Sequence, residues 1–173
     1  MGEEMIISHY APEAWQYVFN TPLECGLRCA ALLLAAYPGR CDLQRLLQYE
    51  YLLVHSGDVE QGPPSLHPGA PHRAGELLVR RGLVERGLLF MMSHHIVCRE
   101  FSTQGIQYFA GDTALPLFDS LGSRYSRSLR ERAVWVVNRF GGQSDTLLGE
   151  FMRDNWSNWG SEFTYELLTR RGE

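Results

Sequence analysis

Residues 97–110 read VCREFSTQGIQYFA, and this stretch decides the fold that we predict for the chain. Two short runs rich in β-branched and aromatic residues, 97–101 and 106–110, flank the connection Ser102-Thr103-Gln104-Gly105. Runs of this length, joined by a few residues that include glycine, are typical of a β-hairpin. We therefore predict one hairpin, in a chain whose other segments favour helices.

The first helix before the hairpin is signalled by Thr21-Pro22-Leu23-Glu24, which has the pattern of a capping box. Pro22 falls at the first helical position, where its missing N–H has no consequence. Apolar residues then recur at helical spacing until Tyr-Pro-Gly at 37–39, which we expect to end the helix.

The second helix is predicted to begin after Asp42, a favourable N-cap residue, and to end at 55–57. Residues 57–71 contain three glycines and four prolines and predict a long loop. A loop of this length is unusual in a compact domain, so we expect it to contact a partner. We place that contact at His55, Asp58 and His67.

The third helical segment, 70–95, is predicted to form one or two helices, broken or kinked near Gly82 or Gly87. Three helices followed by a hairpin is the order of a winged helix-turn-helix, with the hairpin as the wing and 83–94 as the recognition helix. The predicted fold class is mainly α with a small β-hairpin, and consists of a winged helix-turn-helix-like core with C-terminal helices.

The segment after the hairpin is predicted to be helical. Asp112 or Thr113 caps a short helix, a longer one follows around 129–140, Ser144 caps another, and 163–168 adds a final turn. We divide the chain into an N-terminal arm (1–20), a winged-helix-like core (21–111) and a C-terminal helical extension (112–173).

Composition favours a globular protein of the cytoplasm. The 173 residues carry a net charge of −4, and 45% of them are hydrophobic. No apolar run approaches the roughly 18 residues of a membrane span, and no secretory signal accompanies the four cysteines, so we expect reduced thiols and no membrane contact. All 16 basic residues are arginine, whose planar guanidinium can form bidentate hydrogen bonds with carboxylates or phosphates.

No cofactor, metal or catalytic group is predicted. No phosphate-binding Gly-Lys-Ser/Thr loop is present, so the chain should not bind ATP by itself. Cys25 and Cys29, four residues apart, lack the paired spacing of a structural zinc site and are better explained as buried apolar side chains.

One catalytic alternative is a papain-like cysteine hydrolase that uses Cys25, since a helix N-terminus lowers a thiol pKa. The candidate bases would be His67, His72, His94 and His95. The capping box, however, places Cys25 on a packing surface of the first turn.

Two groups of side chains are candidates for binding. Arg73, Arg80, Arg81 and Arg86 surround the proposed recognition helix and are possible DNA contacts. Glu76 and Glu85 lie among them, which favours solvated or protein-contact faces. Trp156 and Trp159 are candidate partner-binding anchors, or else core residues.

Several short motifs, taken together in order, resemble a known protein family. They are 20–24 (NTPLE), 42–46 (DLQRL), 58–59 (DV), 65–68 (SLHP), 75–81 (GELLVRR), 83–88 (LVERGL) and 129–133 (LRERA). Over 20–140 the chain is similar to the middle component of bacterial ABC-three component (Lamassu-like) systems, which defend against phage or plasmids.

The resemblance implies a non-catalytic adaptor that bridges an SMC- or Rad50-like ATPase subunit and an effector subunit, often a nuclease. Any contact with DNA would then be made through the complex. The resemblance carries over no catalytic residue. A stand-alone winged-helix DNA-binding regulator is the other alternative, because it shares the predicted fold.

Overall fold

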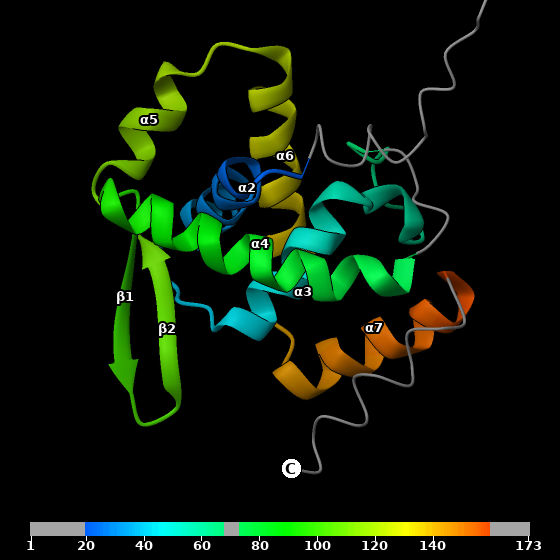
Figure 1. The fold of residues 1–173 in the computed structure, drawn as a ribbon. Helices are drawn as coiled ribbons and strands as arrows, with labels where there is room; N and C mark the ends of the chain where they lie inside the picture. Colours follow the sequence, from blue (N-terminus) through cyan, green and yellow to red (C-terminus); the bar gives the residue numbers. More distant parts are fainter. Residues whose placement is uncertain (1–19, 68–72, 160–173) are drawn as a thin grey trace, which may run out of the picture.

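The computed structural model describes residues 20–67 and 73–159, which form six α-helices and one β-hairpin (Figure 1). In chain order the elements are α2 (Pro22–Ala35), α3 (Leu43–Val54), the short 3-10 helix η1 (Ser56–Asp58), α4 (Arg73–Ser93), β1 (Val97–Ser102), β2 (Gly105–Ala110), α5 (Ala114–Ser120), α6 (Arg124–Phe140) and α7 (Asp145–Trp159). The predicted fold class, mainly α with a small hairpin, is confirmed. Apart from Asn20, the predicted arm lies outside the described residues, as does the predicted turn at 163–168.

The starts of α2 and α3 follow the capping chemistry read from the sequence. The backbone N–H of Glu24 donates to the Thr21 hydroxyl over 3.3 Å, and the Glu24 carboxylate accepts from the Thr21 N–H over 3.0 Å. Asp42 likewise accepts from the N–H of Arg45 over 2.7 Å. These contacts satisfy N–H groups that have no partner within the helix, which is why both helices begin where the sequence predicts.

Helix α2 lies at the centre of the fold and contacts α3, α4, α5, α6 and β2 (Figure 1). Its side chains Cys29, Ala30, Leu32 and Leu33 are at most 1% exposed. Because α5 and α6 pack directly on α2, the C-terminal helices share one core with the first three. The division at 111/112 stays a prediction.

Helix α4 runs without interruption from Arg73 to Ser93, so this segment is one helix and is not broken at Gly82 or Gly87. At Gly87 the helix crosses α2 so closely that a Cβ atom would lie 2.4 Å from the carbonyl oxygen of Pro22 and 2.6 Å from the nitrogen of Gly26. At Gly82 an added Cβ would meet nothing within 4 Å. Gly87 therefore allows the close crossing of α4 and α2.

The hairpin has the strands that the sequence predicts, with an antiparallel register from Val97 opposite Ala110 to Ser102 opposite Gly105. A single β-bridge between Cys41 and Tyr108 attaches the side of β2 that faces away from β1 to the segment between α2 and α3. Strand β1 is left at the edge of the molecule (Figure 1). The order of three helices and a hairpin is compatible with a winged helix-turn-helix.

Of the predicted caps after the hairpin, Ser144 is confirmed, because its hydroxyl accepts an N–H bond at the start of α7. Thr113 precedes α5 but makes no side-chain capping bond, and α6 is capped by Ser123, which the sequence analysis did not name. The stripe Leu129, Ala133, Val136 and Phe140 of α6 is buried, as the apolar spacing predicts. Over 20–67 and 73–159, no helix combines the length and apolar character that a membrane span requires.

Candidate functional site

Three charged side chains meet inside the bundle and form what we call the buried cluster: Arg28 of α2, Glu50 of α3 and Arg80 of α4. The Arg28 Nε and the Arg80 Nη1 each lie 2.7 Å from a different carboxylate oxygen of Glu50. All three residues are at most 3% exposed. One carboxylate thus joins the three helices that precede the hairpin.

All three side chains of the cluster are charged at neutral pH. Burial alone would raise the pKa of Glu50, but the guanidinium groups of Arg80 and Arg28 outweigh it and lower that pKa to about 2. The pKa of Arg28 is raised, since the attraction of Glu50 outweighs its burial. Removing one member of a buried ion pair leaves the other uncompensated in a medium of low polarity, which is strongly destabilising. The cluster therefore fixes how α2, α3 and α4 are arranged.

Further polar groups surround Arg28. Its Nη2 lies 3.2 Å from the Asn20 Oδ1 and 3.1 Å from the Cys25 Sγ. The start of α6 adds Tyr125, whose hydroxyl lies 3.1 Å from the His67 Nε2. The cluster therefore connects the start of α2, the loop after α3 and the start of α6.

His67 is held in place as a neutral side chain. Its backbone N–H, together with that of Leu66, donates to the carbonyl oxygen of Val54 at the end of α3. Burial, followed by the positive charge of Arg28, lowers the pKa of His67 to about 4. An imidazole with this pKa is uncharged at neutral pH, as its position beside two guanidinium groups requires.

Cys25 has the properties of a buried thiol. Its residue is 0% exposed, and burial, followed by the negative charge of Glu50, raises its pKa to about 11. Cys29, one turn further along α2, has a pKa well above its ordinary value for the same first cause. Because the thiolate is the reactive form of cysteine, these shifts oppose nucleophilic chemistry at neutral pH.

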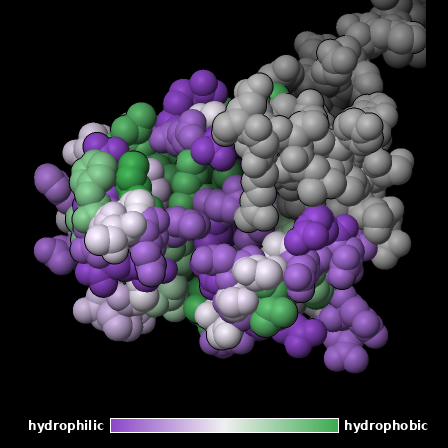
Figure 2. All heavy atoms as spheres, turned by 90° about the horizontal axis from the view of Figure 1, so that it is seen from below, coloured by the Kyte–Doolittle hydropathy of each residue, from purple (hydrophilic) through white to green (hydrophobic). Residues whose placement is uncertain are grey.

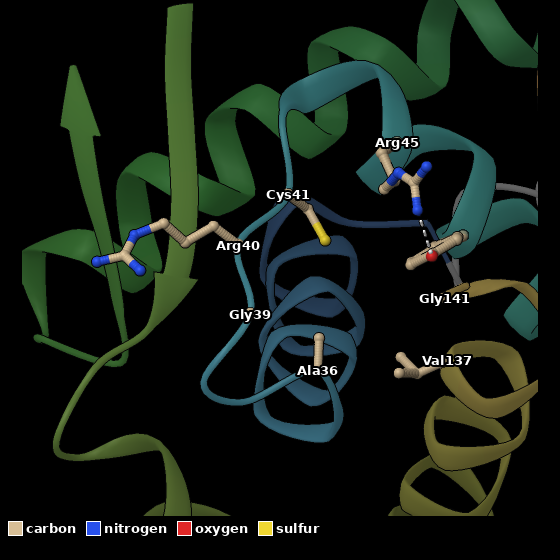
Figure 3. Close-up of a pocket in the computed structure, with 8 residues that line it drawn as sticks. Ala36, Gly39, Arg40, Cys41, Arg45, Val137 and Gly141 are labelled. Atoms are coloured by element: carbon tan, nitrogen blue, oxygen red, sulfur yellow. Dashed lines mark hydrogen bonds between the residues drawn. The ribbon is translucent and has the colours of Figure 1, made fainter. Parts of the chain in front are cut away.

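A separate cleft of about 250 Å³ lies where the end of α2 and the start of α3 face the end of α6 (Figure 3). Its wall includes Cys41, whose side chain points into the space, and Gly39, Val137 and Gly141. Burial raises the pKa of Cys41 to about 11, so this thiol too is protonated at neutral pH.

The two arginines that border this cleft are each paired with a carboxylate of another element. Arg40 points away from the cleft, lies 2.6 Å from the Glu100 carboxylate and stacks over the ring of Phe109 (Figure 3). Arg45 donates to the Tyr49 hydroxyl and lies 2.7 Å from Asp145 of α7. These two arginines therefore link the hairpin and α7 to the helical bundle. Because both are already paired with carboxylates, the cleft is not favoured as an anion-binding site.

Comparison with known proteins decides which family this fold belongs to. The sequence matches the family model described as ABC-three component (ABC-3C) system Middle Component 2 over residues 18–162, which is most of the chain. The chain belongs to this family. It accordingly works together with the other components of such a system. Searches among curated proteins and among solved structures gave no match.

In this middle component, the side chains predicted to contact a partner after α3 are largely internal. His55 is 2% exposed and packs against the ring of Tyr51 at 4.8 Å, and His67 is 9% exposed with its ring nitrogen 3.1 Å from the Tyr125 hydroxyl. Asp58 is half-buried, with its carboxylate 3.4 Å from the Tyr51 hydroxyl. The predicted partner contact through His55 and His67 does not fit this burial, because the loop folds back onto the end of α3.

The arginines predicted to contact DNA are distributed differently from the expectation. Arg80 is 3% exposed and bound by Glu50, so its guanidinium is not available to a DNA groove. Arg81 is exposed and pairs with Glu85 one turn away over 3.2 Å, and Arg86 is exposed. The interleaved acidic residue noted in the sequence thus neutralises part of the proposed recognition helix.

Three other predicted site residues can be placed only on their helices. Arg73 lies at the start of α4, and Trp156 and Trp159 lie in the last turn of α7. Their side chains fall outside the described residues.

The sequence prediction missed the buried cluster of the middle component because Arg28 and Glu50 had no role in the motifs considered. A signal was present. Glu50 is the only charged residue in the otherwise apolar run 49–54, and a charged residue inside such a run is rarely buried unless it is paired. The identity of its two partners, however, depends on how three separate helices pack.

Proposed function

We propose that this chain is a non-catalytic adaptor in a Lamassu-like defence complex, where it bridges an SMC- or Rad50-like ATPase subunit and an effector subunit in the bacterial cytoplasm. The observation that carries the proposal is the family match, which covers 145 residues, 18–162, including every described helix. A middle component has partners by definition, and a bridge is the simplest role for a small chain among them. The four free cysteines support the cytoplasmic location.

The distribution of polar and apolar groups supports an adaptor. Two ion pairs of the described residues lie inside the bundle, where they link helices. Large apolar side chains lie outside, among them Phe101 at 75%, Leu89 at 57% and Leu147 at 56% exposure. Such side chains are available as apolar anchors for an interface with a partner.

The non-catalytic part of the proposal is supported by the environment of Cys25. A hydrolase would need that thiol to be accessible and ionised, whereas it is buried with a raised pKa. A thiol-reactive probe tests this point. We expect Cys25 to remain unlabelled in the folded protein, whereas Cys98, which is half-buried on β1, is labelled faster. Rapid labelling of Cys25 would contradict the proposal.

The bridging role is tested by co-expressing the three components with an affinity tag on the ATPase. We expect the effector to co-purify with the ATPase when this chain is present and to be lost when its gene is omitted. Glu85→Gln, which alters an exposed pair on α4, serves as a control for non-specific effects of substitution. Recovery of an equal amount of effector without the chain would rule out the bridge.

A stand-alone DNA-binding regulator is the second candidate, and the order of three helices and a hairpin is the observation in its favour. The engagement of Arg80 by Glu50 and of Arg81 by Glu85 counts against it. A gel shift of the purified chain at several salt concentrations separates the two functions. A DNA-binding regulator would bind duplex DNA with an affinity that falls steeply with salt, whereas an adaptor would bind weakly at any salt concentration.

A further inference from the structure

The outer edge of strand β1 carries backbone groups that are available for another strand. The N–H and C=O of Tyr108 both bond to Cys41, over 2.8 and 3.0 Å, and therefore point away from β1. Arg99 lies opposite Tyr108 in the register. Since inward and outward pairs alternate along an antiparallel ladder, the N–H and C=O of Arg99 point to the outer edge, and so do those of Phe101.

This edge is uncovered within the described part of the chain. Over 20–67 and 73–159, no backbone hydrogen bond links the outer groups of Arg99 or Phe101 to another element. Figure 1 places β1 outermost, with β2 between it and the helices. Natural proteins usually protect such edges, because unpaired N–H and C=O groups invite pairing with another chain.

The side chains along the edge add a mixed apolar and cationic surface. Phe101 is 75% exposed, Ile106 opposite it is 37% exposed, and the Arg99 guanidinium lies 5.4 Å from the Phe101 ring. On the face of the molecule seen from below, green apolar atoms lie largely in the hairpin half of the described surface (Figure 2). Glu100 on the other side of the strand is already paired with Arg40. Arg99 is thus the charge that the edge offers to a partner.

We propose that β1 accepts an extended segment of another component of the system as a third strand. The backbone of that segment would bond to the outer groups of Arg99 and Phe101, an acidic side chain would lie beside Arg99, and an apolar one would pack on Phe101. Strand addition of this kind combines backbone bonds with side-chain selectivity. The proposal rests on the adaptor function and names where one of its partners binds.

Charge favours a different chain over a second copy of this one. If two copies of β1 paired in an antiparallel arrangement, the residues whose N–H and C=O point to the outer edge would have to lie opposite each other. The registers that align most of the strand are centred on Arg99 or on Glu100, and each places that residue directly opposite its own copy. Like charges in directly opposed positions are destabilising. An acidic strand from another protein meets no such repulsion.

The same surface fits nucleic acid poorly. Affinity for a phosphate backbone depends on several cations acting together. The hairpin presents Arg99 together with the apolar Phe101 and Ile106, and Arg40 is already paired with Glu100. A protein segment with one acidic and one apolar contact matches these groups better.

The decisive experiment measures amide hydrogen exchange, resolved to single residues, for the free chain and for its complexes with the purified ATPase and with the purified effector. In one of the complexes we expect the amides of Arg99 and Phe101 to exchange at least tenfold more slowly. The amides of Cys98 and Glu100, which face β2, serve as the internal control and should change less.

A matched pair of substitutions tests the backbone contribution separately. Both Arg99→Ala and Arg99→Pro remove the guanidinium, but only the proline removes the outward N–H, without cost to the bonds between β1 and β2. We expect Arg99→Pro to bind the partner at least tenfold more weakly than Arg99→Ala. Slow exchange of the Tyr108 amide, which bonds to Cys41, verifies that the hairpin is intact in both variants.

The possible outcomes distinguish this proposal from the adaptor function. If a complex forms without slower exchange at Arg99 and Phe101, and both variants bind equally, strand addition is wrong and the adaptor role stands. If neither the ATPase nor the effector binds, both proposals fall. A homodimer or a DNA complex that is lost on Arg99→Pro would assign the edge to a second copy or to nucleic acid and would overturn the inference.

Discussion

The buried cluster and the hairpin distribute polar and apolar groups in opposite ways. In the cluster, Arg28, Glu50 and Arg80 place charge where water is excluded, and the Glu50 carboxylate pairs with both guanidinium groups. In the hairpin, Phe101 places a large aromatic ring in solvent. Charge in the interior gives α2, α3 and α4 one preferred arrangement, and an apolar group outside leaves a surface for a partner. A change in the first region should therefore alter folding, and a change in the second should alter binding.

The largest expected effect comes from breaking the cluster with Glu50→Gln. Two buried guanidinium groups would lose their counter-charge, and we expect the free energy of unfolding to fall by about 3–5 kcal/mol. Chemical denaturation measures the change. Glu85→Gln on α4 breaks an exposed pair and should cost about 0.5 kcal/mol or less. Equal effects of the two substitutions would refute a special role for the cluster.

The next largest effect concerns the two glycines of α4. An alanine at position 87 would force its Cβ into the backbone of α2, so we expect Gly87→Ala to destabilise the protein by about 1–3 kcal/mol or more. Gly82→Ala meets open space and should stabilise the helix by up to about 1 kcal/mol. Thermal unfolding of the pair measures both, and opposite signs are the expected result. If both lowered the melting temperature alike, the close crossing at Gly87 would be in doubt.

Acid should lower the stability of the protein in two steps. The pKa of His67 is lowered from 6.5 to about 4, so the unfolded chain binds the proton more readily, and stability falls as the pH drops from about 6.5 to 4. The pKa of Glu50 is lowered from 4.5 to about 2, so its contribution is present above pH 4.5 and is lost between about 4.5 and 2. Each step is of the order of 3 kcal/mol at most, since one pKa unit corresponds to about 1.4 kcal/mol.

Unfolding curves at a series of pH values, recorded for the native protein and for His67→Gln, separate the two steps. The variant should lack the loss between pH 6.5 and 4 and keep the loss below pH 4.5. An unchanged profile in His67→Gln would show that another group titrates in the upper range.

The smallest effect on stability is expected in the hairpin. Because Phe101 is 75% exposed, Phe101→Ser should change the free energy of unfolding by no more than about 0.5 kcal/mol. The same substitution should weaken the partner complex, which a binding titration of the purified components would measure. A variant that is strongly destabilised, yet binds normally when folded, would reverse the contrast between the two regions.

Much of the secondary structure was predictable because it rests on local chemistry. The capping box at Thr21, the cap at Asp42 and the two strands of the hairpin each depend on residues close together in sequence. The candidate site was less predictable. His55 and His67 were expected to contact a partner from the composition of their loop, but the loop folds back onto α3 and buries both.

Local sequence patterns were therefore sufficient for the kinds of elements, their order and the caps at Thr21, Asp42 and Ser144, since a cap or a turn involves only a few neighbouring residues. Packing assigned the roles of particular residues across the chain. Gly87 allows a helix crossing because Gly26, 61 positions earlier, meets it there. Glu50 is paired because α2 and α4 bring Arg28 and Arg80 to it from 22 and 30 positions away. Contacts of that separation depend on how whole helices fit together, and no short stretch of sequence contains that information.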